Sequence, residues 1–366
     1  MSRYAPLRSR VDDISGAGLA RTLRQLTMTG PVSGQLDGAP VTVFCSNDYL
    51  GLAHHPAVTA AFTGTGSGAS RLISGNRPAH EALERRLEEM YGRPATLFSS
   101  GYHANLALMS TAVQAGDRVA SDALNHASLI DGLRLSRAER HILPHNDPSA
   151  IPEGTRMVVV EGVYSMDGDI IDLPAYTGEH WLVVDEAHAF GVLGEHGLGA
   201  AHACGVNPDF VVGTLGKAIG TYGAFVVGPP ELKALLISQG RSFIFTTGLP
   251  EPVVNASLVA LELATDERRQ RLQANVHRFR TGLDQLGIPA LGNTHIVPVV
   301  LGPRTMAVAD RLLAKGHWAA GIRPPTVPAG LERVRFTLSA AHTHQQIDAL
   351  LSDFSHALKE VPCDNA

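Results

Sequence analysis

The sequence is poor in cysteine: Cys45, Cys204 and Cys363 stand alone, without a C-x-x-C pair. An odd number of isolated cysteines excludes a disulfide framework and a cysteine-based zinc site, and it favours a reducing compartment. No apolar run approaches the roughly 18 residues that a membrane span needs. Residues 1–6 lack the apolar core of a secretory signal. We therefore expect a cytoplasmic protein without a membrane segment.

The sequence also lacks a surplus of positive charge. The net charge is −5 and 18% of the residues are charged, so there is no basic footprint for nucleic acid. His141 and His145 have the spacing of helical metal ligands, but Pro144 between them breaks a helix and no acidic third ligand is evident. We interpret both histidines as non-ligands and expect no metal.

Hydrophobic residues (44%) and glycines (37) are plentiful in the 366-residue chain. A chain of this length can bury a large core and suggests about two domains. We predict an N-terminal arm over residues 1–45, a large cofactor-binding domain over 46–250, and a linking helix with a small C-terminal domain over 251–366. The arm is expected to hold a helix near Gly16–Leu26 and a short strand at Val41–Cys45.

The large domain shows apolar strands alternating with helices, which indicates an α/β fold with a mostly parallel central sheet covered by helices. Pro78–Met90 has the stripe of an amphipathic helix. The predicted strands are Thr96–Phe98, Arg118–Ser121, His141–Leu143, Met157–Glu161, Leu182–Asp185, Phe210–Thr214 and Ala224–Val227.

The remainder of the chain predicts one long helix followed by a small α+β domain. The helical stretch covers Val253–Leu286. The small domain is expected to contain strands at Ile296–Leu301, Ala319–Ile322 and Val334–Leu338, with helices at Met306–Lys315 and from His344 onward.

The most informative residues are Asp185 and Lys217, each of which closes a strongly apolar strand segment. Ligands of parallel sheets bind just beyond the carboxyl ends of the strands. A carboxylate and an amine delivered there can hold pyridoxal phosphate, with the lysine as Schiff base and the aspartate as partner of the pyridinium nitrogen.

Two other interpretations compete with a cofactor site. The tetrapeptide Asp185–His188 resembles the magnesium-binding motif of helicase ATPases, but the accompanying phosphate loop needs G-x-x-x-x-G-K-[ST]. The segment Gly213–Lys217 has two residues between its glycines, and Ala218 replaces the required hydroxyl. Alternatively, Asp185 caps a turn and Lys217 is a solvated surface residue, which the small, apolar neighbours of Lys217 disfavour.

Other polar residues follow the predicted strands at positions suited to a cofactor. Ser99–Asn105 leads from a strand into an apolar helical run, and the backbone N–H groups of a helix start bind phosphate. His126 is a candidate to stack on the ring. Ser165, His188 and Thr214 are candidates to contact its polar groups.

Taken together, these segments resemble the α-oxoamine synthase family of fold-type-I pyridoxal-phosphate enzymes. The resemblance covers residues 46–342 in the family's order. The matching segments are Ser46–Leu52, Ser70–Gly75, Asn125–Ser128, Glu161–Asp169, Val184–His188, Gly213–Lys217, Ile322–Pro328 and Arg335–His342.

The resemblance assigns a role to each matching position. Catalysis is expected from Lys217, His126 and Asp185. The cofactor is expected to contact the backbone of Gly101 and Tyr102, the stacking His126, the pyridinium partner Asp185, His188 near the ring hydroxyl, Ser165 and Thr214, and Lys217 itself.

The family forms homodimers with the active site at the interface, and the resemblance implies the same here. Thr246 or Thr247 is expected to reach the neighbouring subunit's phosphate. Arg335 matches the residue that grips the amino-acid carboxylate. Arg21 and Thr326 match product-side contacts, although Arg24 could replace Arg21, because it would lie one helical turn away.

Within the family, the sequence is most similar to members that condense L-alanine with a pimeloyl thioester, carried by acyl carrier protein or CoA, in biotin biosynthesis. Ile322–Pro328 favours this substrate pair. The alternatives are glycine with acetyl-CoA, or an amino acid with a longer acyl chain.

Overall fold

The computed structural model describes residues 3–362 of the chain. Its centre is a seven-stranded sheet in the order β4-β10-β9-β8-β7-β5-β6. Its strands are β4 (Ala95–Phe98), β5 (Arg118–Asp122), β6 (Glu139–Leu143), β7 (Met157–Glu161), β8 (Trp181–Asp185), β9 (Phe210–Thr214) and β10 (Ala224–Val227). All the strands of this sheet run parallel except β10, which is antiparallel to both neighbours. The predicted mostly parallel sheet is confirmed.

The direction of β10 follows from the short loop that precedes it. Residues 215–223 connect β9 to β10, and a parallel connection would need a crossover of a dozen or more residues. The loop closes tightly at Gly220, which has φ +71° and where a Cβ would lie 2.4 Å from the backbone nitrogen of Ala53. This loop carries Lys217.

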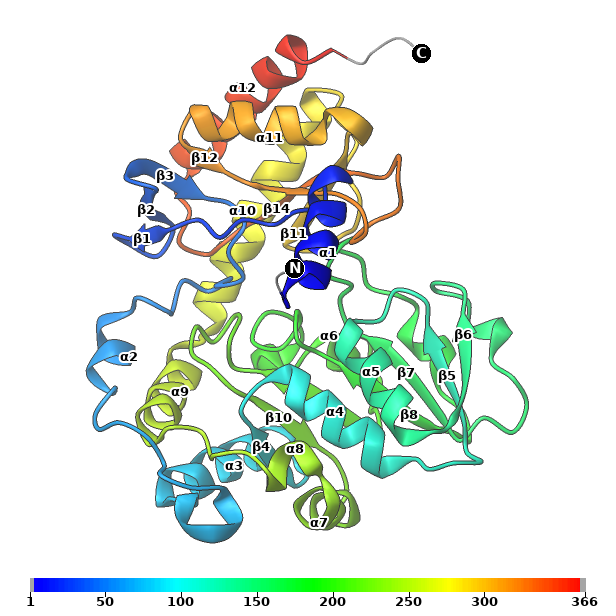
Figure 1. Cartoon of the computed structure of the whole chain (residues 1–366). Helices are drawn as coiled ribbons and strands as arrows, with labels where there is room; N and C mark the ends of the chain where they lie inside the picture. Colours follow the sequence, from blue (N-terminus) through cyan, green and yellow to red (C-terminus); the bar gives the residue numbers. More distant parts are fainter. Residues whose placement is uncertain (1–2, 363–366) are drawn as a thin grey trace.

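Helices cover both faces of the sheet (Figure 1), and the strands β4, β7, β9 and β10 are buried along their whole length. In β7, Val159 packs on one face with α4 and α5, whereas Val158 and Val160 pack on the other face beside α6. The helices of this part are α2 (Pro56–Ala60), α3 (Pro78–Tyr91), α4 (Gly101–Ala112), α5 (Ala127–Ser136), α6 (Ala200–Ala203), α7 (Pro230–Gln239) and α8 (Arg241–Ile244), with a π-helical turn at Arg71–Gly75. The predicted helix Pro78–Met90 is confirmed as α3.

The seven-stranded sheet and its helices form one large layer. The C-terminal part forms a second, smaller layer, which lies above the large one in Figure 1. An antiparallel sheet in the order β11-β14-β13 packs against helices. Its elements are β11 (Ile296–Val300), α11 (Thr305–Ala314), β13 (Ala320–Ile322), β14 (Arg333–Thr337) and α12 (His344–Glu360). They match the predicted small α+β domain.

The prediction of one helix over Val253–Leu286 was wrong. The structure has two helices, α9 (Glu251–Leu263) and α10 (Asp266–Gln285). Thr265 adopts an extended conformation with ψ 161°, which interrupts the helix. Asp266 and Glu267 then occupy the first turn of α10, where negative charge is favoured by the helix dipole.

The prediction of a helix near Gly16–Leu26 was also wrong. The helix α1 (Ala5–Gly16) lies earlier, and residues 17–25 are not helical. Pro6 suits the first turn of α1, and Gly18 at φ +67° helps to end the helical path. The arm continues as β1 (Leu26–Met28), β2 (Ser33–Leu36) and β3 (Ala39–Val43), and β3 pairs with β12 (His317–Trp318).

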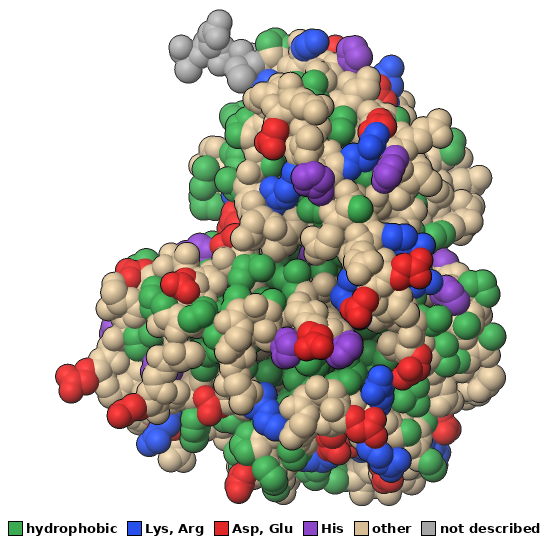
Figure 2. Space-filling model, turned by 180° about the vertical axis from the view of Figure 1, so that it is seen from behind, with side chains coloured by type: hydrophobic (Ala, Val, Ile, Leu, Met, Phe, Trp, Pro, Cys, Tyr) green, Lys and Arg blue, Asp and Glu red, His purple; other side chains and the backbone are tan. Residues whose placement is uncertain are grey.

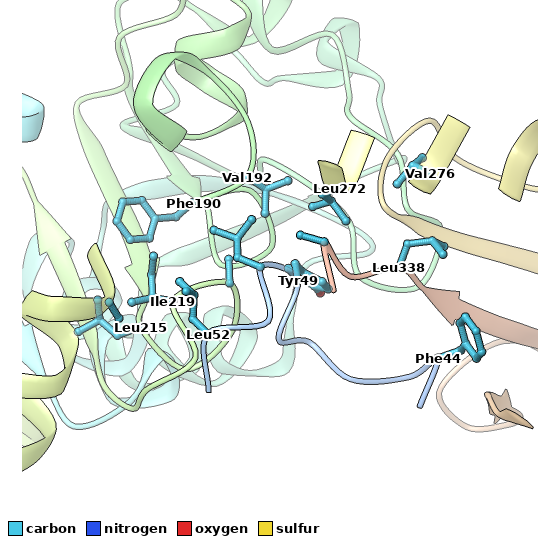
Figure 3. Close-up of a cluster of buried hydrophobic side chains, with 14 of the residues drawn as sticks. Phe44, Tyr49, Leu52, Phe190, Val192, Leu215, Ile219, Leu272, Val276 and Leu338 are labelled. Carbon is cyan, nitrogen blue, oxygen red and sulfur yellow. The ribbon is translucent and has the colours of Figure 1, made fainter. Parts of the chain in front are cut away.

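One buried cluster joins the arm to both layers (Figure 3). Phe44 and Tyr49 come from the segment after β3, Phe190 and Ile219 from the large layer, and Leu338 from the small one. Figure 2 shows hydrophobic side chains gathering in the recess between the two layers. This core contains side chains from all three predicted segments, 1–45, 46–250 and 251–366. The limits of these segments therefore stay predictions.

Within residues 3–362, no helix is long and apolar enough to cross a membrane. No group of three metal-ligating side chains occurs in the same described part of the chain. Cys45 and Cys204 are free thiols, and Cys363 lies outside the described residues.

Replacing Phe336 with alanine should lower the free energy of unfolding by about 3–5 kcal/mol, because the side chain is fully buried between Phe279 and Phe354. Urea titration followed by circular dichroism measures this loss. The control Phe62→Ala removes the same side chain where it is 57% exposed and should cost less than about 0.5 kcal/mol. Equal losses would contradict the assigned core.

Candidate functional site

A cavity of about 180 Å³ lies at the carboxyl ends of β7, β8 and β9. This is where parallel sheets bind ligands. The lining residues are Gly101, Tyr102, Asn105, His126, Ser128, Glu161, Asp185, Ala187, His188, Thr214 and Lys217. Seven residues of this set were expected from the sequence: Gly101, Tyr102, His126, Asp185, His188, Thr214 and Lys217.

Asp185 ends β8, and Lys217 lies in the loop after the adjacent strand β9. Asn105 Nδ2 donates to Asp185 Oδ2 at 2.7 Å, and the backbone N–H of Ala187 donates to Oδ1 at 2.9 Å. Burial lowers the pKa of Lys217 to about 8, although the charges of Asp185 and Glu161 oppose the shift. The amine and the carboxylate therefore share one cavity and interact electrostatically.

His188 is fixed by a buried tyrosine. Its Nδ1 lies 2.6 Å from the hydroxyl of Tyr49, which also donates to Asn47 Oδ1 at 3.0 Å. Burial lowers the pKa of His188 well below its ordinary value, and the positive charges of Lys217 and Arg335 add to the shift. We conclude that His188 is a neutral imidazole in the folded protein.

The start of α4 supplies a site for an anion. Ser100 caps the helix by accepting a hydrogen bond from the backbone N–H of His103 at 3.3 Å. Gly101 and Tyr102 occupy the first turn, where backbone N–H groups have no partner within the helix. These groups line the same cavity as Lys217. A phosphate is the kind of group that such a helix start binds.

His126 and Thr214 complete the cavity wall. His126 caps α5, and its Nδ1 lies 2.8 Å from Ser128 Oγ. Burial lowers the pKa of His126, with the charge of Asp185 acting in the opposite direction. Thr214 Oγ1 donates to the carbonyl of Gly223 at 3.1 Å and accepts from the N–H of Gly216 at 3.2 Å, which braces the Lys217 loop.

Ser165 and Arg335 lie outside the cavity lining. Arg335 is buried in β14, and its Nε donates to the carbonyl oxygen of Ser165 at 2.5 Å. Its positive charge contributes to the lowered pKa values of both Lys217 and His188. Arg335 therefore belongs to the electrostatic environment of the cavity.

Arg21 and Thr326 are brought together, although they lie 305 residues apart. Arg21 Nη2 donates to Thr326 Oγ1 at 3.5 Å. Arg24 instead pairs with Asp37 at 2.8 Å. Residues 17–25 are not helical, so the expectation that Arg24 lies one helical turn from Arg21 was wrong. The geometry favours Arg21 as the residue beside Thr326.

Thr246 and Thr247 are separated from Lys217. They line a different, small pocket, which also includes Arg71 and His80. They do not line the Lys217 cavity of their own chain.

The sequence interpretation assigned no role to several residues of the site. Asn105, which holds Asp185, lies one helical turn after Gly101, and this spacing was a usable signal. Glu161 ends β7 directly opposite Asp185 in the strand register, and Tyr49 reaches His188 from the arm side. These last two contacts depend on strand pairing and packing.

The chemistry of the cavity fits pyridoxal phosphate. The group requires an amine for its aldehyde, a carboxylate for its ring nitrogen and an anion site for its phosphate. Lys217, Asp185 and the start of α4 supply these three, and all of them line one cavity.

Sequence comparisons find related proteins over most of the chain. The family model for aminotransferase class I and II matches residues 39–354. The 8-amino-7-oxononanoate synthase of Methylococcus capsulatus is 47% identical over 353 residues, which cover 89% of this chain and 91% of the relative. The protein of the same name from Saccharophagus degradans is 44% identical over 345 residues, which cover 87% of each.

Solved structures share the fold. A serine palmitoyltransferase from S. paucimobilis with bound PLP has a TM-score of 0.91 and 31% identity, covering 98% of both chains. The 8-amino-7-oxononanoate synthase from Francisella tularensis has a TM-score of 0.77 and 31% identity, covering 87% of this chain and 98% of that one.

His145, expected to be a non-ligand, forms an ionic contact instead. Its Nδ1 lies 3.0 Å from Asp122 Oδ1, and its Nε2 lies 2.9 Å from Asp169 Oδ2. Burial alone would lower the pKa of His145, but hydrogen bonds to Asp122 and Asp169 outweigh burial and raise it to about 10. The charged histidine ties the end of β5 to the loop after β7.

Replacing His145 with glutamine should lower the free energy of unfolding by about 1–3 kcal/mol near pH 6. The folded pKa lies above the ordinary value of 6.5, so the stabilisation is complete below that value and is lost as the pH rises towards 10. Urea unfolding of both proteins should therefore show a smaller difference near pH 10. A difference independent of pH would contradict a charged His145.

Proposed function

This chain belongs to the aminotransferase class I and II family, and from this we propose that it condenses L-alanine with a pimeloyl thioester. The products would be 8-amino-7-oxononanoate, CO2 and the free thiol carrier, in biotin biosynthesis. The observation that carries the proposal is the shared cavity of Lys217 and Asp185, in a chain 47% identical to an 8-amino-7-oxononanoate synthase. Membership of this family excludes the alternative interpretation of Asp185–His188 as the magnesium-binding motif of an ATPase.

The cofactor of this reaction would be pyridoxal phosphate. When bound, it supplies a conjugated ring that accepts the electron pair released at the substrate's Cα. Lys217 would hold it covalently, and Asp185 would bind its ring nitrogen. Gly101 and Tyr102 would bind its phosphate through backbone N–H groups.

The remaining cofactor contacts would come from residues around the ring. His126 would stack on the ring face. His188 and Ser165 would lie toward the ring hydroxyl, and Thr214 would brace the lysine loop. His188 is suited to this position because a neutral imidazole adds no positive charge beside Lys217.

Proton transfer is the catalytic task assigned to Lys217. An amine with a pKa of about 8 is partly uncharged near neutral pH, so Nζ can take a proton from the substrate's Cα. Arg335 would bind the alanine carboxylate, because a guanidinium pairs with a carboxylate through two parallel hydrogen bonds. Its Nε bond to the Ser165 carbonyl fixes the plane of that guanidinium.

A homodimer would complete the site. Thr246 or Thr247 would contact the cofactor phosphate of the neighbouring subunit, which accords with their separation from Lys217 in their own chain. Arg21 and Thr326 would contact the product side. The thioester carrier, acyl carrier protein or CoA, and a cytoplasmic location stay predictions.

A longer-chain acyl donor is the second candidate. The serine palmitoyltransferase from S. paucimobilis covers 98% of this chain with a TM-score of 0.91. Its 31% identity is below the 47% of the Methylococcus capsulatus relative, so the pimeloyl donor is preferred.

The purified protein should release CO2 and free thiol with L-alanine and a pimeloyl thioester, and much more slowly with serine and palmitoyl-CoA. Glycine with acetyl-CoA is the third combination to assay. Pimeloyl-CoA and pimeloyl-acyl carrier protein, assayed side by side, separate the two carriers. Preference for palmitoyl-CoA would overturn the substrate assignment while leaving the cofactor chemistry in place.

Replacing Lys217 with alanine should abolish the visible absorbance of the lysine-bound cofactor and reduce turnover by several orders of magnitude. The control Lys359→Ala changes an exposed lysine at the end of α12 and should leave both unchanged. Spectra of the purified, cofactor-loaded proteins measure the first effect. Full turnover by the Lys217 variant would remove its assigned role.

A further inference from the structure

Glu161 is a buried carboxylic acid at the cofactor cavity for which no role has been assigned above. It ends β7, lines the cavity and is 4% exposed. In the strand register it lies directly opposite Asp185. An uncompensated carboxylate in such a place would be costly, so its hydrogen-bond partners indicate what it does.

The carboxylate of Glu161 holds the backbone of His126. Oε1 accepts a short hydrogen bond from the His126 N–H. That N–H lies at the N-cap of α5, directly beside the imidazole that lines the cavity. Because an N-cap residue lies outside the helical hydrogen-bond ladder, its N–H needs a partner from elsewhere.

The residue before His126 is held to the same strand. Asn125 Nδ2 donates to the carbonyl of Val159 in β7 at 2.8 Å and to Ser121 Oγ at 2.9 Å. The Tyr164 hydroxyl donates to Asn125 Oδ1 at 3.5 Å and accepts from the backbone N–H of Glu161 at 3.2 Å. The turn that carries His126 is therefore clamped to β7 at two points, and Glu161 is the clamp nearest the imidazole.

The surroundings of Glu161 disfavour the charged form of its carboxyl group. Burial raises the pKa of Glu161 well above its ordinary value, and the neighbouring charge of Asp185 raises it further; the Lys217 ammonium and the His126 N–H oppose the shift. Asp185 is the better-compensated carboxylate, because Asn105 and Ala187 donate to its two oxygens. Burial therefore favours the protonated form of Glu161.

We propose that Glu161 is a positioning residue that fixes the His126 imidazole in the cofactor cavity through its hydrogen bond to the His126 N–H. The hydrogen bond, and not a negative charge, is the required feature. This inference rests on the proposed function in one respect, the binding of pyridoxal phosphate.

The test measures the dissociation constant of pyridoxal phosphate for cofactor-free protein by absorbance titration. Glu161→Gln keeps an amide oxygen for the His126 N–H and should stay within about twofold of the native protein. Glu161→Met and Glu161→Ala remove the acceptor and should weaken binding about tenfold or more, which corresponds to about 1.4 kcal/mol for the unpaired buried N–H.

Glu186→Met is the matched control. Glu186 follows Asp185, is 1% exposed, and accepts from the backbone N–H groups of Ala200 and Ala201 at 2.8 Å each. It does not line the cavity. Its loss should lower thermal stability without changing cofactor affinity, which separates a general loss of folding from a specific effect on the site.

The outcomes are distinguishable. No binding by the native protein would overturn both the proposed function and this inference. Native binding with unchanged affinity in the folded Met or Ala variant would overturn the inference alone. If Glu161→Gln weakens binding as much as Glu161→Met, the charge is needed and the neutral hydrogen bond is wrong. If Met and Ala variants do not fold, native-like affinity in the folded Gln variant supports the inference, and a loss there overturns it.

Discussion

The site depends on three neighbouring parallel strands that end at one edge of the sheet. The chain delivers Glu161 from β7, Asp185 from β8, and Lys217 from the loop after β9. Buried charges are costly unless they are paired and hydrogen-bonded. Here one amine faces two carboxyl groups, and each carboxyl group receives hydrogen bonds from a nearby helix or turn. Burial lowers the pKa of this amine, whereas the two carboxyl groups oppose the shift.

The sequence predicted the elements whose signals are local. Most strands of the central sheet were predicted because they are short apolar runs, and α3 because its apolar stripe follows Pro78. The break between α9 and α10 was missed because neither glycine nor proline marks it at Ala264 and Thr265. The helix of the arm was placed too late, since the glycines at 16 and 18 were read as lying within a helix rather than at its end.

The candidate site was predicted less evenly, because pairing between strands is not visible in one sequence. Asp185 and Lys217 were recognised from their positions at strand ends, and both line the cavity. Glu161 has the same kind of position, but a glutamate at a strand end has many ordinary explanations. Its importance follows from its register opposite Asp185 and from the contact with His126, which lies 35 residues earlier.

Arg21 and Thr326, the residues proposed for the product side, lie outside the central sheet. Residues 17–25 of the arm meet the loop at 322–328, where Arg323 donates to the carbonyl oxygens of Gly18 and Ala20 and Arg21 reaches Thr326. Both segments lack helix and extended strand over most of their length. The serine palmitoyltransferase from S. paucimobilis superposes on 98% of this chain. The cavity of Lys217 and Asp185 is built by the sheet, whereas Arg21 and Thr326 meet where the arm contacts the loop.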